Sequence, residues 1–514
     1  MNFPGTGPAD SFRSLIGPEV RSILDSLGGY LAGRDIESYL VGGFIRDTLL
    51  GRDTADIDIA VAADALDIAS EVADAFGGKY VPLDELNRVG RVITGKSGHS
   101  EAVQLKLDFS TFQGTIEQDL ARRDFTIDAM AVNLEILGES SADIIIDPFD
   151  GREDLQQEVI RAVSETSFSS DAVRLLRAVR LAAELGFSID KQTGVAIQRD
   201  SHLVSGVAGE RVRDELLRLL ALPGAGKFVS LLDDLGLLTA LIPELGEAKG
   251  VEQPREHFWN VFDHSIKTVQ AVEFLLGQGD WEYAGEDVLA SIPWSPELSG
   301  HFNREVSSGS TGKSLLKLAA LLHDICKPQT KALDNGRIRF LGHSQEGAVT
   351  TADILERLRF SAKEKKLIET EVKYHMRPNQ MSQEGLPTGR AVYRYFRDTG
   401  EAGIDILFLS LADHLATRGP NLDLSGWQEH TGLVDYVISQ YLEQKNIVQP
   451  AKIVDGYDIM KRFGIKPGPE VGSLLEAVRE AQASGEVNTR EEALVYIGEL
   501  LASSYSLKDE KNGN

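Results

Sequence analysis

The segment 38–61 constrains the fold of this chain more than any other, because two short apolar stretches flank a glycine turn and an amphipathic stretch. It reads SYLVGGFIRDTLLGRDTADIDIAV. We expect a strand, a turn at Gly42-Gly43, a helix, and a second strand that carries Asp56 and Asp58. Alternate side chains of a strand share a face, so the two carboxylates should lie about 7 Å apart on one side. Such a pair near a helix N-terminus suits a metal-triphosphate complex and predicts nucleotidyl transfer.

A solvated strand with acidic residues on its outer face has the same pattern, so further evidence is needed. The segment 103–112, VQLKLDFSTF, alternates apolar and polar residues and predicts a half-buried strand. Its polar face carries Asp108, which makes a third carboxylate available.

Four further segments add to this evidence: ARRDFTIDAMAV (121–132), DPFDGREDL (147–155), SDAVRLLRAVRLAAELGF (170–187) and GERVRDELLRLL (209–220). Together with segment 38–61, they resemble the motifs of the class II tRNA nucleotidyltransferase family, in the family's order. This family contains the bacterial and eukaryotic CCA-adding enzymes and the bacterial poly(A) polymerases, and it belongs to the DNA polymerase β superfamily.

At 514 residues the chain is too long for one core. Pattern and resemblance together predict an α+β multidomain fold, with a small mixed-sheet nucleotidyltransferase head at 1–150. An all-helical neck with a base-recognition helix (151–245), an HD phosphohydrolase-like helical domain (246–425) and a helical tail (426–514) should follow. Within the third block, 277–314 is rich in Gly, Ser, Pro and acids, and we expect an exposed excursion there.

Composition limits the class of protein. The net charge of −26 argues against nonspecific coating of nucleic acid, so RNA contact should be local, near arginines such as Arg174, Arg177 and Arg180. No apolar run is long enough to span a bilayer, and the N-terminal residues do not resemble a signal peptide. Cys326 is the only cysteine, which excludes an internal disulfide. We therefore expect a cytoplasmic protein with no membrane partner.

The resemblance implies roles for residues of the head. Asp56 and Asp58 would hold Mg²⁺ ions, which activate the 3′-hydroxyl of tRNA and stabilise the pyrophosphate leaving group of CTP or ATP. Asp108 would be a third catalytic carboxylate. The nucleotide-binding residues would be Gly42, Gly43, Arg46, Arg122, Arg123, Asp124, Asp128, Asp171, Arg174 and Arg177. Asp128 stands where the family usually has Asn, so its contribution to sugar or phosphate binding is open.

Base choice follows from hydrogen-bonding chemistry. Cytosine and adenine both present an exocyclic amino donor beside a ring-nitrogen acceptor, whereas uracil and guanine present a carbonyl beside an N–H. One carboxylate and one guanidinium therefore accept C and A and reject U and G. The family's EDxxR helix motif serves this purpose, and Asp171 and Arg174 occupy its Asp and Arg positions, with Ser170 in place of Glu. A surface ion pair with i,i+3 spacing is the alternative.

The connection from Asp108 to Arg122 is short and runs directly through STFQGTIEQDLA. Family members that add the full CCA usually have a longer stretch here, with a flexible loop rich in Arg and aromatic residues. Members with a shortened loop include enzymes that add only CC. This connection therefore predicts CC addition, with a partner enzyme completing the end.

The second helical block holds six residues in the order H…HD…H…H…D, which resembles the HD phosphohydrolase superfamily: His264, His323, Asp324, His343, His375 and Asp413. Imidazole and carboxylate ligands suit a divalent transition metal (Mn, Ni, Co or Fe) or Mg²⁺. The implied activity is hydrolysis of a 2′,3′-cyclic phosphate or phosphomonoester at an RNA end. A degenerate HD domain kept as a helical spacer is the alternative. His257, His414 and His430 match no ligand position and are interpreted as structural or surface residues.

The segment after Val454 resembles the C-terminal part of the same family. Pro467 to Pro469 precede an amphipathic helix, whose N-terminus could accept an RNA phosphate, although a simple turn explains the pattern equally well. We therefore expect a template-independent nucleotidyltransferase that adds C and/or A to tRNA 3′ ends, with a possible phosphohydrolase activity. The rivals are a poly(A) polymerase and a noncatalytic RNA-binding protein. The oligomeric state is open.

Overall fold

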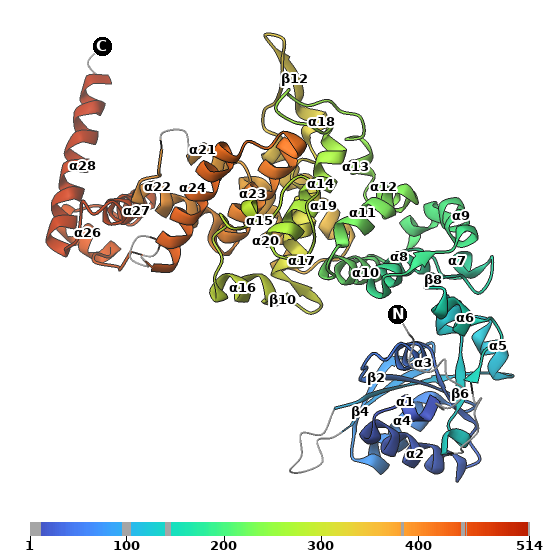
Figure 1. The fold of residues 1–514 in the computed structure, drawn as a ribbon. Helices are drawn as coiled ribbons and strands as arrows, with labels where there is room; N and C mark the ends of the chain where they lie inside the picture. Colours follow the sequence, from blue (N-terminus) through green and yellow to red (C-terminus); the bar gives the residue numbers. More distant parts are fainter. Residues whose placement is uncertain are drawn as a thin grey trace. The chain divides into compact units, whose positions relative to one another are not determined.

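The computed structural model describes residues 12–94, 104–138, 145–381, 385–443, 448 and 450–511 (Figure 1). The chain forms two compact units: residues 1–207 with 234–240, and residues 208–233 with 241–514. A mixed-sheet head is followed by helical regions, which confirms the predicted α+β multidomain class. The ranges of the four domains stay a prediction. No helix in these described ranges is long and apolar enough to cross a membrane.

The first unit is built on a seven-stranded mixed sheet in the order β3-β4-β5-β2-β1-β6-β7. The strands are β1 (Ser38–Val41), β2 (Asp56–Val61), β3 (Lys79–Asp84), β4 (Val89–Ile93), β5 (Lys106–Thr111), β6 (Ala131–Asn133) and β7 (Ile145–Ile146). Strands β2 and β5 pair in parallel, and every other neighbouring pair is antiparallel. The three strands predicted from the sequence are all present. β5 begins at Lys106, and Val103 lies outside the described residues.

Helix α4 (Ala65–Phe76) covers one part of this sheet. Its N-cap Asp64 accepts a hydrogen bond from Leu66 N, and Gly77, with φ of +65°, ends it. The helix packs on β3, β4 and β5, with Ile68 and Val72 buried. The alternation of apolar residues along β2 explains this layer, because Ile57 and Ile59 are fully buried beside the acidic positions.

The connection after β5 packs on the face that carries Asp58. Phe112, Ile116 and Leu120 are buried together with Tyr39 and Val41 of β1, and Val41 pairs directly with Asp58. Cross-strand partners share a face of the sheet. The connection contains one turn and helix α5 (Ile116–Leu120), which begins with a capping box at Thr115. This segment is therefore part of the head's core.

The rest of the first unit is mainly helical, with α6 (Gly151–Gln156), α7 (Ser167–Ser170), α8 (Arg174–Leu185) and α9 (Lys191–Asp200). The prediction of an all-helical neck is wrong in one detail. Two-residue strands β8 (Val159–Ile160) and β9 (Ser188–Ile189) pair in parallel. A strand of two residues has no periodicity that sequence reasoning could detect.

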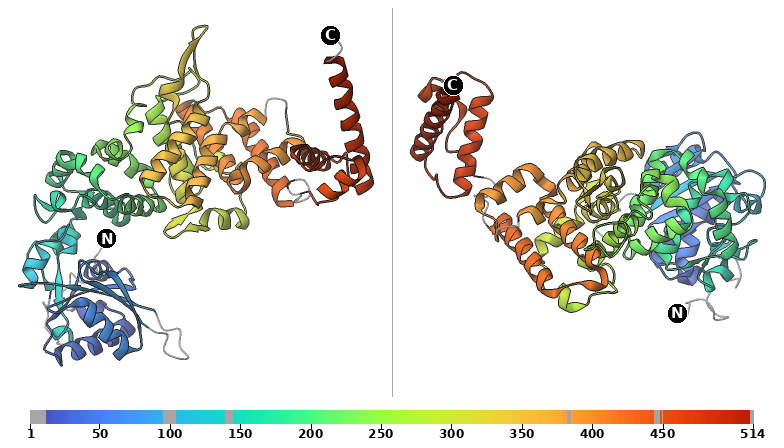
Figure 2. Two further views of the ribbon diagram at one scale, coloured as in Figure 1. Left: turned by 180° about the vertical axis from the view of Figure 1, so that it is seen from behind. Right: turned by 90° about the horizontal axis from the view of Figure 1, so that it is seen from above.

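The second unit is a bundle of helices with short strand pairs (Figure 2). Its centre contains α14 (Val261–Leu275), α17 (Gly312–Leu322), α19 (His343–Arg357), α20 (Ala362–Tyr374) and α23 (Gly403–Arg418). Helix α14 packs on α17 and α23, and α20 packs on α17 and α19. The hairpin of β12 (Lys331–Asp334) and β13 (Arg337–Phe340) projects from these helices in Figure 1.

A buried ion pair joins α14 and α17, and its carboxylate also contacts the start of a further helix, α11 (Ala225–Asp234). Lys317 and Glu273 are almost completely buried, and Lys317 Nζ lies 2.8 Å from Glu273 Oε1. The same carboxylate accepts hydrogen bonds from the N–H groups of Ala225 and Gly226, at the start of α11. Because all its partners are present, this buried charge is fully compensated.

The expectation of an exposed excursion at 277–314 is wrong. This range contains α15 (Glu286–Leu289), α16 (Pro296–Asn303) and the β10–β11 strand pair (Glu305–Ser307 and Ser310–Thr311). Trp281, Val288, Leu298 and Phe302 are buried, and the Phe302 ring lies 4.7 Å from that of Phe408. Its apolar residues are too widely spaced to give a helical period, but each fills a place in the core.

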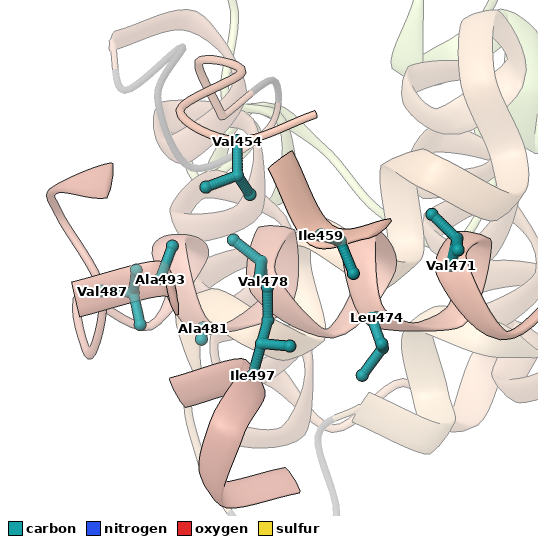
Figure 3. Close-up of a cluster of buried hydrophobic side chains, with 9 residues drawn as sticks. All are labelled: Val454, Ile459, Val471, Leu474, Val478, Ala481, Val487, Ala493 and Ile497. Atoms are coloured by element: carbon teal, nitrogen blue, oxygen red, sulfur yellow. The ribbon is translucent and has the colours of Figure 1, made fainter. Parts of the chain in front are cut away.

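The tail has its own small core (Figure 3). Helices α26 (Gly456–Phe463), α27 (Pro469–Ala483) and α28 (Arg490–Lys511) enclose side chains that include Ile459, Val478 and Ile497. Ion pairs link α22 (Gly389–Thr399) to α27 and to the turn that follows it: Arg394–Glu480 and Arg397–Glu476 to the helix, and Arg390–Glu486 to the turn. These pairs are partly exposed to solvent, so each contributes little stability.

Candidate active sites

Three side chains of the head stand in a row across three neighbouring strands. Asp58 of β2 pairs with Asp108 of β5, and Asp108 pairs with Arg91 of β4. Arg91 donates two hydrogen bonds to Asp108, from Nε to Oδ1 and from Nη2 to Oδ2, both 2.7 Å long. Two residues earlier in β2, Asp56 pairs with Lys106, whose Nζ lies 3.3 Å from Asp56 Oδ1. The register thus places three carboxylates and two cations on one face.

The electrostatics of Asp58 suit a cation. Burial raises the pKa of Asp58 to about 6, with Arg123 opposing the rise and Asp108 adding to it. An ionised carboxylate that is costly in the free protein is stabilised by a bound metal ion. Asp56 is exposed, and among the described residues the three head carboxylates do not converge into a group with all ligand atoms within 4.8 Å.

The glycine turn meets these residues at close range. Gly42 has φ of +70°, and a Cβ there would lie 2.9 Å from Arg123 Nη1 and 3.2 Å from Asp58 Oδ2. Glycine is favoured at this position, because another residue would be strained at this φ and its Cβ would crowd Arg123 and Asp58. The turn, Arg123 and Asp58 therefore surround one point at the start of α3 (Gly43–Leu49).

Arg46, predicted as a phosphate contact, is buried and already paired. It contacts Asp47 through Nε and Nη2, at 3.0 and 3.1 Å, and its Nη1 donates to Asp128 Oδ1 over 2.7 Å. Asp128 is also buried, and its Oδ2 has no partner in the part of the chain that the structure describes. The carboxylate at this position therefore accepts from Arg46 and holds it near Gly43, whose Cβ would lie 3.3 Å from Arg46 Nη2.

Arg122, Arg123 and Asp124, the RRD motif of segment 121–132, lie between the glycine turn and α8. Arg177 Nε is 3.1 Å from Asp124 Oδ2, and Arg123 Nη2 is 3.3 Å from Asp119 Oδ2. Arg122 is exposed, with Nη2 3.2 Å from Asp119 Oδ1. The motif is thus tied by ion pairs to both the preceding α5 and the following α8.

Asp171 and Arg174 flank the start of α8, and Asp171 lies outside the helix. Asp171 is extended, with φ of −153°, and Arg174 is the first helical residue. Arg174 Nη2 donates to the carbonyl of Arg122 over 2.7 Å, and Nη1 lies 3.1 Å from Ser167 Oγ and 3.3 Å from Ser170 Oγ. The serine at the family's Glu position therefore contacts the arginine itself, and Ser167 adds a second contact.

The second unit brings the six predicted HD residues together. His264 and His323 have their Nε2 atoms 3.3 Å apart, and so have His343 and His375. Asp324 Oδ2 lies 3.2 Å from His323 Nε2, and Oδ1 lies 3.5 Å from His343 Nε2. Asp413 Oδ1 is 3.0 Å from His264 Nε2. One carboxylate thus faces two histidine pairs, an arrangement that fits two metal ions with Asp324 between them.

Hydrogen bonds fix the imidazoles in an orientation suited to metal binding. His323, His343 and His375 place Nδ1 within 2.6 to 2.8 Å of the carbonyls of Ala320, Phe340 and Val372, so their Nε2 atoms remain for the centre. Burial lowers the pKa of His375 to about 3 and also lowers that of His343 and His264, which keeps these rings neutral. Asp324 is buried: its Oδ2 lies 2.6 Å from Lys327 Nζ, and its Oδ1 has no hydrogen-bond partner among the described residues.

The sequence matches three family profiles. They are described as "Poly A polymerase head domain" (residues 38–161), "Probable RNA and SrmB- binding site of polymerase A" (186–249) and "HD domain" (297–418). An A-adding tRNA nucleotidyltransferase from Deinococcus radiodurans is 34% identical over 89% of this chain and 94% of that protein. A CC-adding tRNA nucleotidyltransferase from Thermus thermophilus is 32% identical, over 90% of this chain and 93% of that protein. The chain belongs to the class II tRNA nucleotidyltransferase family.

Solved structures share the fold of this tRNA nucleotidyltransferase. A CCA-adding enzyme in complex with CTP matches with a TM-score of 0.64 at 23% identity, over 96% of this chain and 97% of that one. The Thermotoga maritima CCA-adding enzyme complexed with tRNA matches with a TM-score of 0.60 at 22% identity, over the same shares of the two chains.

Some site residues of the tRNA nucleotidyltransferase were not predicted. Arg91 is absent from the expected set because its partner is set by sheet register. Lys327 has its Nζ 2.6 Å from Asp324 Oδ2, and its i,i+3 spacing from Asp324 could have revealed it. The His257 ring lies 5.5 Å from that of His264, so this histidine borders the HD centre.

Proposed function

We propose that this tRNA nucleotidyltransferase adds C residues to tRNA 3′ ends and has CC as its main product. The observation that carries the proposal is the connection from β5 to Arg122, which is short and packed into the head's core by Phe112, Ile116 and Leu120. This connection, as it stands, contains only a turn and α5, and therefore no long loop that could switch the site from C to A. The CC-adding relative supports the proposal, while the A-adding relative of similar identity makes terminal A addition the alternative outcome.

The head residues would act as follows. Asp56 and Asp58 would hold divalent ions, for which we propose Mg²⁺. These ions would supply Lewis-acid chemistry to the 3′-hydroxyl and to the leaving pyrophosphate. Gly42 and Gly43 leave the backbone N–H groups at the start of α3 open to a phosphate. Arg123, beside Gly42 and Asp58, would face the triphosphate, and Asp108 would be the third carboxylate.

Base selection would rest on Asp171 and Arg174. The guanidinium of Arg174 is held by Ser167, Ser170 and the Arg122 carbonyl, which presents it in one orientation. A fixed donor beside a carboxylate acceptor matches the amino edge of cytosine or adenine. Arg122, Asp124 and Arg177 would support this arrangement through their ion pairs. Asp128 would instead hold Arg46 beside the glycine turn of the nucleotide site.

The test is end-sequencing of the products made from two substrates, tRNA that lacks its 3′ end and tRNA that ends in CC, each with CTP, with ATP and with both. We expect CC ends with either mixture that contains CTP. Complete CCA ends, or A added only to tRNA that already ends in CC, would overturn the proposed product. Long A tracts would indicate a poly(A) polymerase. Asp56→Ala and Asp58→Ala should abolish incorporation, and wild-type rates in either would overturn the proposed metal ligands.

We also propose a metal-dependent phosphohydrolase activity in the HD domain, with a 2′,3′-cyclic phosphate or a phosphomonoester at an RNA end as substrate. Its support is the convergence of four imidazoles on both oxygens of the buried Asp324. Bound ions would supply a nucleophilic water at neutral pH. Lys327, which touches Asp324 and donates to Gln253 Oε1 over 2.7 Å, places a positive charge where a substrate phosphate would sit.

The phosphohydrolase proposal is tested by metal analysis and by hydrolysis of 2′,3′-cyclic AMP with Mn²⁺, Ni²⁺, Co²⁺, Fe²⁺ or Mg²⁺. Asp324→Ala should lose bound metal and hydrolysis while it still adds nucleotides. The matched control is Asp353→Ala, on the same domain but outside the centre. Neither bound metal nor hydrolysis with any of these ions would leave the domain as a helical spacer.

Two coarser features complete the proposal. The tail would contact tRNA, with the N-terminus of α27 after Pro467 and Gly468 as a phosphate contact, and we infer no membrane partner. A cytoplasmic location fits a tRNA substrate and a chain whose only cysteine, Cys326, is free and buried.

A further inference from the structure

The head carries an arginine that its proposed chemistry does not use. Arg91 comes from β4, the strand beyond β5, and its side chain reaches the acidic face through the register that sets it opposite Asp108. Its two hydrogen bonds to Asp108 are parallel and equal in length, 2.7 Å each. A bidentate guanidinium–carboxylate pair fixes the direction of the carboxylate as well as its charge.

The neighbouring cation of the site is held differently. Lys106 meets Asp56 through one contact of 3.3 Å, and its side chain is 46% exposed, with that of Asp56 61% exposed. The Arg91 and Asp108 side chains are 28% and 17% exposed. An exposed single contact is readily exchanged for water or an ion, whereas the more enclosed two-point pair persists.

The pair matters because like charges crowd this face. Asp58 and Asp108 are direct neighbours on parallel strands, and Asp56 lies on the same face of β2. Carboxylates at such spacing repel one another and destabilise this face when no metal ion is bound to it. Arg91 lies beyond Asp108, on β4, and offsets part of this repulsion without contacting Asp56 or Asp58.

We propose that Arg91 is a positioning residue for nucleotidyl transfer. It holds the Asp108 carboxylate in one orientation beside Asp58 and supplies a permanent counter-charge to the three carboxylates on this face of the sheet. This proposal rests on the proposed role of Asp108 as the third carboxylate. Arg91 acts through Asp108 and touches neither nucleotide nor tRNA. Its charge and its two-point geometry have separable effects, the first on metal affinity and the second on turnover.

The variants Arg91→Met, Arg91→Lys and Lys79→Met separate these effects. Lys79 is an exposed cation on β3 of the same sheet and is the matched control. All variants carry Asp324→Ala so that the HD centre does not contribute metal binding. The readouts are Mn²⁺ affinity without nucleotide, the thermal unfolding midpoint in chelator, and kcat and KM for CTP.

We expect Arg91→Met to bind Mn²⁺ more tightly, because a repelling charge is gone, and yet to lose about 10- to 100-fold in kcat, the usual effect of losing a group that orients a metal's ligand. Its unfolding midpoint in chelator should fall. Arg91→Lys should keep near-wild-type Mn²⁺ affinity and lose part of kcat, since it keeps the charge but not the fork. Lys79→Met should change none of these values.

In Arg91→Met, reduced kcat with unchanged Mn²⁺ affinity would indicate general structural damage and would overturn the proposal, as would wild-type kcat. The double variant Arg91→Met/Asp108→Asn removes the repulsion together with the pair. It should unfold at a higher temperature than Arg91→Met and have no lower kcat than Asp108→Asn alone. Wild-type activity of Asp108→Asn would refute the third-carboxylate role itself, whereas an inactive Asp108→Asn beside a fully active Arg91→Met would refute only the role of Arg91.

Discussion

Arg46 donates a hydrogen bond to Asp128 over 2.7 Å, and both side chains are buried beside the Gly42-Gly43 turn. This contact explains how a carboxylate can stand where related enzymes usually have an amide. Asp128 receives a charged donor, and Arg46 in turn keeps the start of α3 in place. The pair therefore supports the Gly42-Gly43 turn, and Arg123 is the cation that remains beside Asp58.

Replacing Asp128 should destabilise the head. Asp128→Asn keeps one acceptor but loses the charge, and we expect a loss of about 1–3 kcal/mol. Asp128→Ala leaves Arg46 with Asp47 alone, and the loss should reach about 3–5 kcal/mol. Thermal and denaturant unfolding of the full chain measures both, and Asp53→Asn, at an exposed position, is the control. Equal stability of all three variants would contradict a structural role for the pair.

Metal binding at the head should depend on pH through Asp58, whose pKa burial raises to about 6. Below this pH the carboxyl is protonated, and Mg²⁺ must displace the proton, so the apparent affinity should fall about ten-fold per pH unit well below pH 6. In chelator, where no metal is bound, folding stability has the opposite dependence on pH from metal affinity. Because the folded state binds this proton more tightly than the unfolded state, the stabilising contribution is present below about pH 4 and is lost as the pH rises through 6. The difference in unfolding free energy between wild type and Asp58→Asn, measured against pH in chelator, isolates the contribution of Asp58. Parallel pH profiles of the two proteins would refute this contribution.

Arg174→Ala should relax discrimination against UTP and GTP more than it slows addition of CTP. Removing a matched donor costs about 1–3 kcal/mol of selectivity. Steady-state comparison of kcat/KM for the four triphosphates measures this effect. Arg174→Lys keeps the charge but not the contacts to Ser167 and Ser170, and it should show intermediate selectivity. Unchanged base preference in both variants would show that Arg174 does not read the base.

Lys317→Met should destabilise the second unit strongly. It leaves Glu273 buried with only the N–H groups of Ala225 and Gly226, and breaking such a pair costs about 3–5 kcal/mol. Lys313→Met, near the start of the same helix but partly exposed, should cost much less. The thermal unfolding midpoint of each variant makes the comparison. Similar midpoints would show that Lys317 is dispensable.

The sequence predicted those parts of the site whose neighbours are close along the chain. The strand-turn-helix-strand of 38–61 places Gly42, Asp56 and Asp58 by local periodicity, whereas the HD residues were predicted from the resemblance of their order along the chain to the HD superfamily. Asp324 and Lys327 lie one helical turn apart, so even this missed contact was within reach of spacing alone.

Contacts set by pairing between distant segments could not be predicted. Arg91 reaches Asp108 only because β4 and β5 pair in one register, and a shift of one residue would turn Arg91 to the other face. The prediction of an exposed excursion at 277–314 was wrong for a related reason. The buried residue Phe302 of this range packs against Phe408 of α23, and a contact with a residue so far along the chain imposes no period on the sequence around Phe302.

The short connection after β5 has an evolutionary consequence. Gln113 and Gly114 are exposed, between the buried anchors Phe112 and Ile116. Inserted residues at this turn would leave the core and the carboxylate row unchanged, because both anchors would keep their contacts with β1. Nucleotide repertoire in such a head can therefore be gained or lost through one insertion or deletion at a permissive point, which lets closely similar chains diverge in the ends that they make.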